Sequence, residues 1–434
     1  RSDIMFKRYA LYLQDLRQHG FFYHVLLMFT YSAMFSTDAF FVPYYLEAGF
    51  SNAQIGILMA VRSAAAIALP PVFGALSDRI RSKRKALLLS LGGTGLCLLL
   101  IPALADVFVL SVGIAAIYSG FSSPVGSLAE TWALSDVELA RAQGSRMAYG
   151  PIRAAGSLGY SSFCLVYYLI LNAFGLSNAY ALYGGFALAV LAFVIGCVGG
   201  KWEHTTASPS AGRSFSMQQL QPRRLFQNYY YMTFLAVYAM LSCALNFGQN
   251  YITQLVVEAG APSSLTGALN FIRSFLEIPV FFIAPRLVRR FGYKKLLMAS
   301  CLAFFAAYLL YLAPFGMSGI LCGQIICGLA GGLMFSSAIS YIYELVPRTL
   351  SATAQAVSAG CNNVVVMLAN LAGGFLVDAL GIRSIFLLCA GILLASFLLF
   401  CLTLRLGHAR GIRPYEVADD PVEQALTGTP MAHP

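Results

Sequence analysis

The chain has 434 residues, of which 59% are hydrophobic and 11% are charged, whereas soluble domains carry about 25% charged residues. Its apolar residues form continuous runs rather than alternating with polar ones, which predicts membrane-spanning helices and excludes a soluble domain or a β-barrel. The net charge of +10 does not indicate a nucleic-acid partner, because nearly all of the 28 Lys and Arg residues lie in loops on one predicted side of the membrane.

Apolar runs of about 20 residues, long enough to cross a hydrocarbon core as helix, recur along the whole chain. A short segment, 1–20, precedes six runs within 21–200, and a polar linker covers 201–228. Six further runs lie within 229–406, and a polar tail covers 407–434. We expect spans near 22–46, 52–73, 86–104, 107–134, 149–173, 178–200, 229–257, 262–285, 296–314, 317–345, 352–379 and 382–406. The predicted fold is an all-α membrane protein with twelve transmembrane helices in two six-helix bundles.

The loop between the second and third predicted spans is short and basic, and it reads Gly74-Ala75-Leu76-Ser77-Asp78-Arg79-Ile80-Arg81-Ser82-Lys83-Arg84-Lys85. Because Lys and Arg near the ends of spans resist translocation, this loop and both termini are expected on the cytoplasmic side, with a bacterial inner membrane as the expected location. The Gly-x-Leu-x-Asp-Arg pattern resembles the signature loop of the major facilitator superfamily. This resemblance implies that Gly74, Asp78 and Arg79 set the balance between inward-open and outward-open states.

The two halves of the chain also resemble each other. A shift of 211 positions aligns distinctive residues of the first half with similar residues of the second, and these pairs are Gly49 with Gly260, Gly56 with Gly267, Arg62 with Arg273, Glu47 with Glu258, Lys83 with Lys294 and Arg84 with Lys295. Two parallel six-helix repeats are typical of major facilitator transporters, which bind their solute at mid-depth between the repeats.

Six charged residues fall in the interior of predicted spans, away from the last two positions at either end, where each costs at least about 2.5–3.5 kcal/mol on insertion scales and therefore needs a reason. They are Asp38, Arg62, Glu130, Arg153, Arg273 and Glu277. Arg273 and Glu277 lie four residues apart, so they share a helical face with Asn270. We predict that Glu277 exchanges a proton and that Arg273 tunes its ionisation. Two alternatives are that this pair only fastens one helix to a neighbour, or that Asp38 is the coupling acid.

Amide side chains form a second polar set. In the seventh predicted span Asn246, Gln249, Asn250 and Thr253 follow helical spacing, and Gln249 aligns with Asp38 under the 211-residue shift. Four polar groups on one stripe favour a wet, solute-binding cavity over simple helix–helix hydrogen bonds. The eleventh span supplies a weaker set with Asn362, Asn363 and Asn370.

The fifth predicted span begins with Pro151-Ile152-Arg153, followed by Gly156, Ser157 and Gly159. This motif resembles the fifth helix of the branch that holds the nucleoside:proton symporters, the phenylpropionate permeases and, more distantly, the lactose permeases. The resemblance implies that Arg153 helps to hold the solute, together with an acid of the fourth helix, here Glu130. The tenth span lacks the His and Glu that lactose permeases use for proton coupling, so Glu277, Asp38 or Glu130 must serve.

Together these features predict a secondary transporter that couples protons to the symport of a small polar solute, such as a nucleoside, a sugar or an aromatic acid. The alternatives are an uncoupled facilitator or drug exporter of the same fold, and a membrane receptor that does not transport. No phosphate-binding loop, catalytic motif or metal-ligand spacing occurs, and the ten cysteines are scattered singly. We therefore expect no enzyme activity, cofactor or metal, and a monomer whose partners are the solute, protons and the bilayer.

Overall fold

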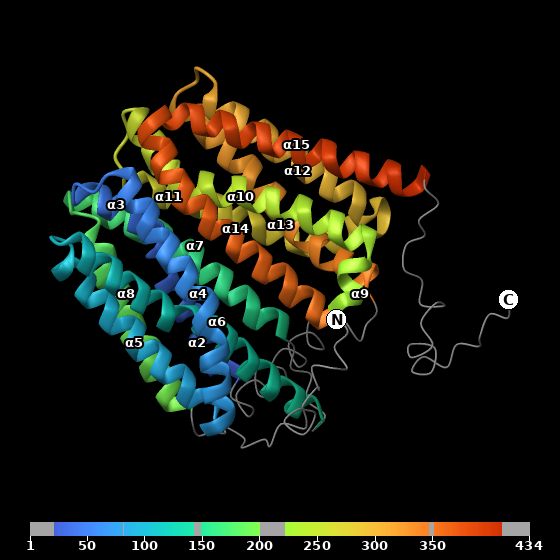
Figure 1. Cartoon of the computed structure of the whole chain (residues 1–434). Coiled ribbons are helices and arrows are strands. Elements are labelled where there is room, and N and C mark those ends of the chain that lie inside the picture. Colours follow the sequence, from blue (N-terminus) through green and yellow to red (C-terminus); the bar gives the residue numbers. More distant parts are fainter. Residues whose placement is uncertain (1–20, 81, 143–148, 200–221, 347–350, 410–434) are drawn as a thin grey trace, which may run out of the picture. The chain divides into compact units, whose positions relative to one another are not determined.

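The computed structural model describes residues 21–80, 82–142, 149–199, 222–346 and 351–409. Every regular element in these ranges is a helix (Figure 1). The helices are α2 (Phe21–Phe35), α3 (Asp38–Glu47), α4 (Asn52–Ile80), α5 (Lys83–Leu104), α6 (Phe108–Ala142), α7 (Tyr149–Phe174), α8 (Ala179–Val198), α9 (Pro222–Gln227), α10 (Tyr229–Glu258), α11 (Leu265–Phe291), α12 (Tyr293–Leu312), α13 (Met317–Leu345), α14 (Ser351–Leu380) and α15 (Ile382–Ala409). The segment 1–20, the first part of the linker and nearly all of the tail lie outside the described residues.

Within the described ranges, twelve stretches of helix are long and apolar enough to cross a membrane, which confirms the predicted number of spans. The fourth of them was predicted too short. Its helix, α6, continues to Ala142, and the apolar stretch reaches Ala140 rather than 134. The reason is that Val137, Glu138 and Leu139 continue the helix with suitable residues after the continuous apolar run ends.

The first span is not one continuous helix, because a turn at Ser36 and Thr37 separates α2 from α3. The Ser36 and Thr37 amides donate to the carbonyls of Ala33 and Met34 at 3.1 Å, three residues back, and their hydroxyls bond the same carbonyls at 2.6 and 2.8 Å. Such tight turns inside a helix often mark functional positions. The break makes Asp38 the first residue of α3.

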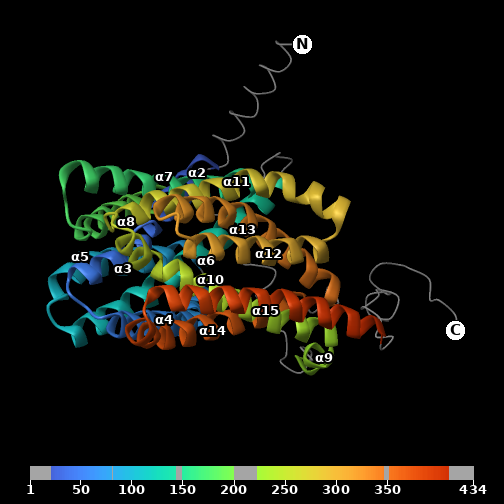
Figure 2. The same ribbon diagram turned by 90° about the horizontal axis from the view of Figure 1, so that it is seen from above.

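The chain forms two compact units. Unit 1 comprises 1–212 with 260–275, and unit 2 comprises 213–259 with 276–434. In unit 1, α6 packs against α4 and α5, while α8 packs against α2 and α5. In unit 2, α12 packs against α13 and α15, and α10 packs against α14 and α15; these neighbours can be followed in Figures 1 and 2. The division into bundles at 21–200 and 229–406 stays a prediction.

Contacts between helices support the internal repeat. The third and fourth spans pair in unit 1 and so do the ninth and tenth in unit 2; likewise the first span packs on the fifth and sixth, and the seventh on the eleventh and twelfth. The aligned glycines Gly49 and Gly260 each follow the first span of their repeat, with φ of 83° and 80°. Only glycine adopts this left-handed conformation without strain, so it ends both helices in the same way.

Charged side chains repeat as well. Glu47, at the end of the first span, accepts the backbone N–H of Asn178 at 2.9 Å, just before α8. Its counterpart Glu258 accepts Arg383 Nε at 2.7 Å, at the start of α15. In each repeat, therefore, the end of the first span is tied to the start of the sixth.

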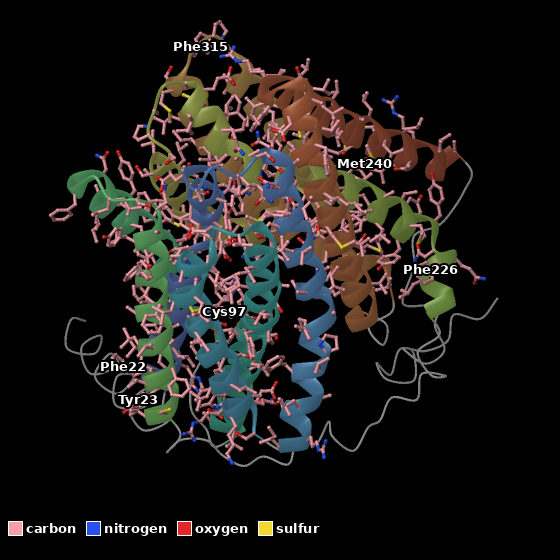
Figure 3. The ribbon with its side chains drawn as sticks, turned by 60° about the vertical axis from the view of Figure 1, so that its left-hand side comes forward. Phe22, Tyr23, Cys97, Phe226, Met240 and Phe315 are labelled. Atoms are coloured by element: carbon pink, nitrogen blue, oxygen red, sulfur yellow. The ribbon has the colours of Figure 1, made fainter. Side chains whose placement is uncertain are left out.

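The outer surface of each unit is apolar, as a bilayer requires. Many large hydrophobic side chains are exposed along the spans, for example Val109, Phe282 and Leu387. Figure 3 shows the contrast between Cys97, which lies buried inside unit 1, and Phe226 and Phe315, which project from unit 2.

Candidate functional site: charged and amide groups inside the spans

The break in the first span presents Asp38 to two donors. Arg62 of α4 donates from Nη2 to Asp38 Oδ1 at 2.7 Å, and the Tyr118 hydroxyl of α6 donates to the same oxygen at 3.0 Å. The Asp38 side chain is 38% exposed and that of Arg62 only 14%. Asp38 is thus the partner of Arg62 on another helix. Its carboxylate links the first, second and fourth spans.

Arg62 is also enclosed by aromatic rings. Its guanidinium lies 4.2 Å from the ring centroid of Phe41 and 5.0 Å from that of Tyr118. Cation–π contacts strengthen when the cation is desolvated, as it is here. Ser119 Oγ donates to the Arg62 carbonyl at 2.7 Å, which fixes the backbone as well. Arg62 is therefore held within unit 1 by its charge, its ring contacts and its main chain.

The fifth-span motif brings Arg153 and Glu130 together. Arg153 Nε lies 3.6 Å from Glu130 Oε1, and both side chains are about half exposed. The guanidinium also reaches Ser157 Oγ at 3.5 Å. These two charges thus meet as the motif implies, and they remain open enough to meet a solute. Their part in solute binding stays a prediction.

The glycines of the same motif allow close helix contact. A Cβ at Gly159 would clash with the carbonyl oxygen of Phe29 in α2, and one at Gly156 would lie 2.9 Å from Ser32 Oγ. Any larger residue at Gly159 would force α7 away from α2. The motif therefore sets the position of Arg153 relative to the first span.

The predicted amide stripe lies on α10, and one of its members reaches another helix. Asn250 Nδ2 donates to Asn370 Oδ1 of α14 at 2.7 Å, while Asn246 Nδ2 bonds the Ser242 carbonyl of its own helix at 2.9 Å. On α14, the Oδ1 atom of Asn362 is buried and has no hydrogen-bond partner among the described residues. Gln249 completes the stripe as predicted. Asn246 and Asn362 retain hydrogen-bonding capacity that a polar solute could use.

The predicted coupling acid, Glu277, lies in the middle of α11 against α13. A Cβ at Gly331 would lie 2.7 Å from Glu277 Oε1, and one at Gly332 would lie 3.2 Å from the Glu277 carbonyl oxygen. The glycine pair therefore makes the room that this carboxylate occupies. Asn270 is buried, and Arg273 is half-buried one turn before Glu277. The Arg273–Glu277 pairing crosses the boundary between the two units and stays a prediction.

Sequence analysis missed a buried acid–base pair near the start of the first span. His24 Nε2 lies 2.8 Å from Asp136 Oδ2, with side-chain exposures of 3% and 9%, and the imidazole meets the Trp132 ring edge-on at 4.9 Å. The predicted end of the fourth span at 134 excluded Asp136, and His24 is only the third residue of the predicted first span. The sequence did offer one signal: Trp132 and Asp136 are four residues apart, which is helical spacing that continues past 134.

Two basic residues of the signature loop, Lys83 and Arg84, bond to other helices of unit 1. Lys83 Nζ donates to Ser135 Oγ at 2.5 Å, and Arg84 donates to the carbonyls of Gly196 and Cys197 at 2.9 and 3.1 Å, at the end of α8. A cation at a helix C-terminus satisfies free carbonyls and opposes the helix dipole. Of the predicted gating residues, Arg79 is exposed and Gly74 is half-buried in α4.

The side chain of Asp78, the third predicted gating residue, lies outside the described part of the structure. Its backbone belongs to the last turns of α4. The gating role of all three residues stays a prediction.

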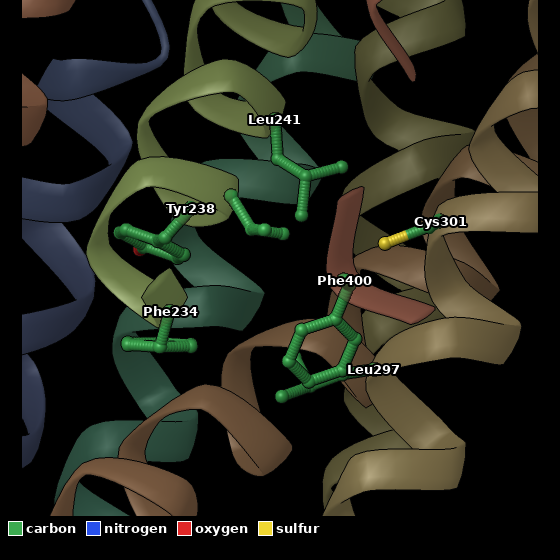
Figure 4. A pocket seen from close by; sticks show the side chains of 7 residues that line it. Phe234, Tyr238, Leu241, Leu297, Cys301 and Phe400 are labelled. Atoms are coloured by element: carbon green, nitrogen blue, oxygen red, sulfur yellow. The ribbon is translucent and has the colours of Figure 1, made fainter. Parts of the chain in front are cut away.

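A pocket in unit 2 is unsuitable for a polar solute. It is lined by Phe234, Val237, Tyr238, Leu241, Leu297, Cys301 and Phe400, between α10, α12 and α15 (Figure 4). These side chains are almost all apolar, so the pocket offers a polar solute few hydrogen-bonding groups. Across the described residues, no group of three His, Cys, Asp or Glu side chains could hold a metal ion.

This arrangement of twelve spans with charges and amides inside them defines a membrane transporter, and the sequence comparison agrees. Residues 21–388 match the MFS_1 like family. The chain therefore belongs to this family of major facilitator transporters, and it is a transport protein rather than an enzyme.

Several known proteins are similar along most of the chain. The uncharacterized transporter YwbF of Bacillus subtilis is 26% identical over 353 residues, covering 81% of this chain and 84% of that protein. The maltose permease of Geobacillus stearothermophilus is 26% identical over 369 residues, covering 84% and 89%. Among solved structures, the nucleoside transporter NupG has a TM-score of 0.74 at 19% identity, covering 88% of this chain and 98% of that one. A D-xylose-proton symporter has a TM-score of 0.65 at 12% identity, covering 90% and 97%. These structures support the fold.

Proposed function

We propose that this protein is a proton-coupled symporter for a small polar solute and that it works by alternating access. The observation that carries the proposal is the set of charged groups held inside the spans, above all Glu130 with Arg153, and Glu277 in the space beside Gly331. Charges inside a bilayer are costly and mark ion or solute pathways. The membrane potential would contribute about 2.3 kcal/mol per proton per 100 mV, in addition to the pH gradient.

The solute would be held at Arg153. Its guanidinium offers five donors in a planar fork and is half exposed beside Glu130 and Ser157. This geometry suits a carboxylate, or the paired hydroxyls of a sugar or nucleoside, with Glu130 accepting hydroxyl hydrogens. Further candidate contacts for the solute are the amides of Asn246, Gln249, Asn250 and Asn362 in unit 2 and of Asn270 in unit 1.

A sugar or a nucleoside is the solute class that the comparisons favour. The relatives include a maltose permease and a melibiose permease, and the solved structures include a nucleoside transporter and a D-xylose-proton symporter. A thermal-shift screen of purified protein against nucleosides, sugars and aromatic acids tests this choice. Stabilisation by one class, absent in Arg153→Ala, is expected. Stabilisation that persists in Arg153→Ala would remove Arg153 from the site.

Glu277 would carry the coupled proton. Arg273, one turn away on α11, favours its ionised form, and the glycine pair of α13 gives the carboxylate its space. Asp38 is the alternative, but its carboxylate already bonds Arg62 and Tyr118, which favours a structural role.

One comparison keeps export open as a second function. A putative sugar efflux transporter of Deinococcus radiodurans is 26% identical over 371 residues. An uncoupled facilitator or drug exporter predicts a flux in proteoliposomes that does not respond to pH or to a protonophore. A receptor predicts binding without counterflow. Either result would replace the symporter proposal.

A further inference from the structure

The junction of α11 and α12 is rich in basic residues. Five basic residues fall within ten positions, namely Arg286, Arg289, Arg290, Lys294 and Lys295. The sequence contains no acidic residue between Glu277 and Glu344, so this junction has no local carboxylate. The side chains of Arg286, Arg290 and Lys295 are exposed. The junction therefore presents a cationic surface.

The corresponding junction of the first repeat uses its charges differently. Lys83 and Arg84 are bonded to α6 and α8 within unit 1. That loop also contains an acid, Asp78, at the position where the second repeat has Arg289. The same repeat element is thus partly neutralised in one half and cationic in the other.

An exposed aromatic residue of α11 lies on the same helix face as two of these arginines. Phe282, Arg286 and Arg290 follow one another at intervals of four residues, so they lie along one face of α11. Phe282 is 68% exposed, and the Arg290 guanidinium lies 5.3 Å from the exposed Phe291 ring. At about 1.5 Å per residue, the distance along the helix axis from aromatic Phe282 to basic Arg290 is about 12 Å. This is the profile of a phospholipid, with acyl chains beside Phe282 and a headgroup beside the arginines.

We propose that the α11–α12 junction binds the headgroup of an anionic phospholipid, with a phosphodiester such as that of phosphatidylglycerol between Arg286 and Arg290. Basic clusters at the end of a span attract anionic lipids. A guanidinium can give a phosphate two parallel hydrogen bonds. The aromatic side chains would hold the acyl chains of the same lipid. This inference does not depend on what the protein transports.

The test is native mass spectrometry of the purified full-length protein titrated with phosphatidylglycerol or phosphatidylcholine. The wild type should retain phosphatidylglycerol preferentially. Arg286→Gln with Arg290→Gln should weaken this binding about tenfold or more, because the phosphate loses both guanidinium partners. The matched control removes two exposed cations on other helices, with Lys85→Gln and Arg405→Gln, and should change binding less than about twofold, because neither side chain belongs to α11.

Two further samples keep the result interpretable. Arg286→Lys with Arg290→Lys preserves the charge and should retain most of the phosphatidylglycerol, which separates a charge effect from misfolding. Inorganic phosphate in excess should leave the lipid bound. Equal retention of both lipids, equal losses in the Gln pair and its control, or displacement by phosphate would each overturn the proposal.

Discussion

The two repeats differ in where they place the acid that accompanies the arginine inside their second span. In the first, the base Arg62 on the second span is neutralised by Asp38 on the first span, at 2.7 Å. In the second, Arg273 stands at the aligned position, but Gln249 replaces the acid, and Glu277 occurs on the same helix as the base. The acid is thus on the first helix in one repeat and on the second helix in the other, and the two acids have different neighbours.

From this difference we expect a structural role for Asp38 and a coupling role for Glu277. Asp38 accepts bonds from two other helices and holds them together, as a structural ion pair does. Glu277 lies where Gly331 and Gly332 leave it room against α13. An acid whose partner is on its own helix can exchange a proton without taking that helix out of contact with its neighbours. We therefore expect damage to the first pair to affect stability and damage to the second to affect coupling.

The largest effect on stability should come from Arg62→Gln. Removal of one partner from a buried ion pair costs about 3–5 kcal/mol, and the low end applies because the Asp38 side chain is 38% exposed. Thermal unfolding in detergent should show a clear fall in Tm, partly restored by adding Asp38→Asn. Arg273→Gln is the matched variant of the second repeat and should lower Tm less. Equal falls would remove the proposed difference between the repeats.

Arg153→Lys should abolish most uptake, by about tenfold or more, because an ammonium cannot reproduce the planar fork of the guanidinium. Uptake into proteoliposomes and solute binding by thermal shift should fall together. Tm without solute should stay close to the wild type, since both members of the Arg153–Glu130 pair are half exposed. Near-normal uptake by the Lys variant would make Arg153 a structural residue.

Tyr118→Phe should give a smaller loss of stability, about 1.5 kcal/mol, the low end for a hydrogen bond to a charged group. The measurement is thermal unfolding at a pH where Asp38 is ionised. The position aligned with Tyr118 in the second repeat is Leu329, which has no hydroxyl to lose. Leu329→Met is therefore the matched control, with little expected change. A Tyr118→Phe protein as stable as the wild type would show that Arg62 alone holds Asp38.

Asp78→Asn should have the smallest effect on binding. We expect a several-fold slower transport rate with an equilibrium affinity for solute within about threefold of the wild type, because the loop biases conformation and does not contact solute. The matched change in the second repeat is Arg289→Gln. Complete loss of binding by a folded Asp78→Asn protein would contradict this placement.

Much of the fold could be predicted from the sequence because hydrophobicity and length determine spans. The twelve spans and the repeat followed from apolar runs, aligned glycines such as Gly49 and Gly260, and aligned charges. The cross-helix pairs could not be predicted, because periodicity shows which face a residue occupies but not what lies opposite. The Asp38–Arg62 bond and the His24–Asp136 pair are of this kind.

Local exceptions to the pattern were also invisible. The turn at Ser36 depends on side-chain hydroxyls that bond carbonyls three residues back, and it leaves the apolar run uninterrupted. In the extension of α6 to Ala142, polar residues such as Asp136 and Glu138 alternate with apolar ones, so a search for continuous apolar runs stops too early. By contrast, the Glu130–Arg153 contact followed from a motif whose glycines set the distance between α7 and α2.

The most direct test of the account compares Glu277→Gln with Asp38→Asn in proteoliposomes. For each variant, accumulation of solute driven by a pH gradient and counterflow without a gradient are measured side by side. The account predicts that Glu277→Gln loses accumulation and keeps counterflow, which needs no net proton movement, while Asp38→Asn keeps both once corrected for folded protein. If Glu277→Gln still concentrates solute against its gradient, or if Asp38→Asn alone uncouples transport, the proton is carried by the first repeat and the assignment is wrong.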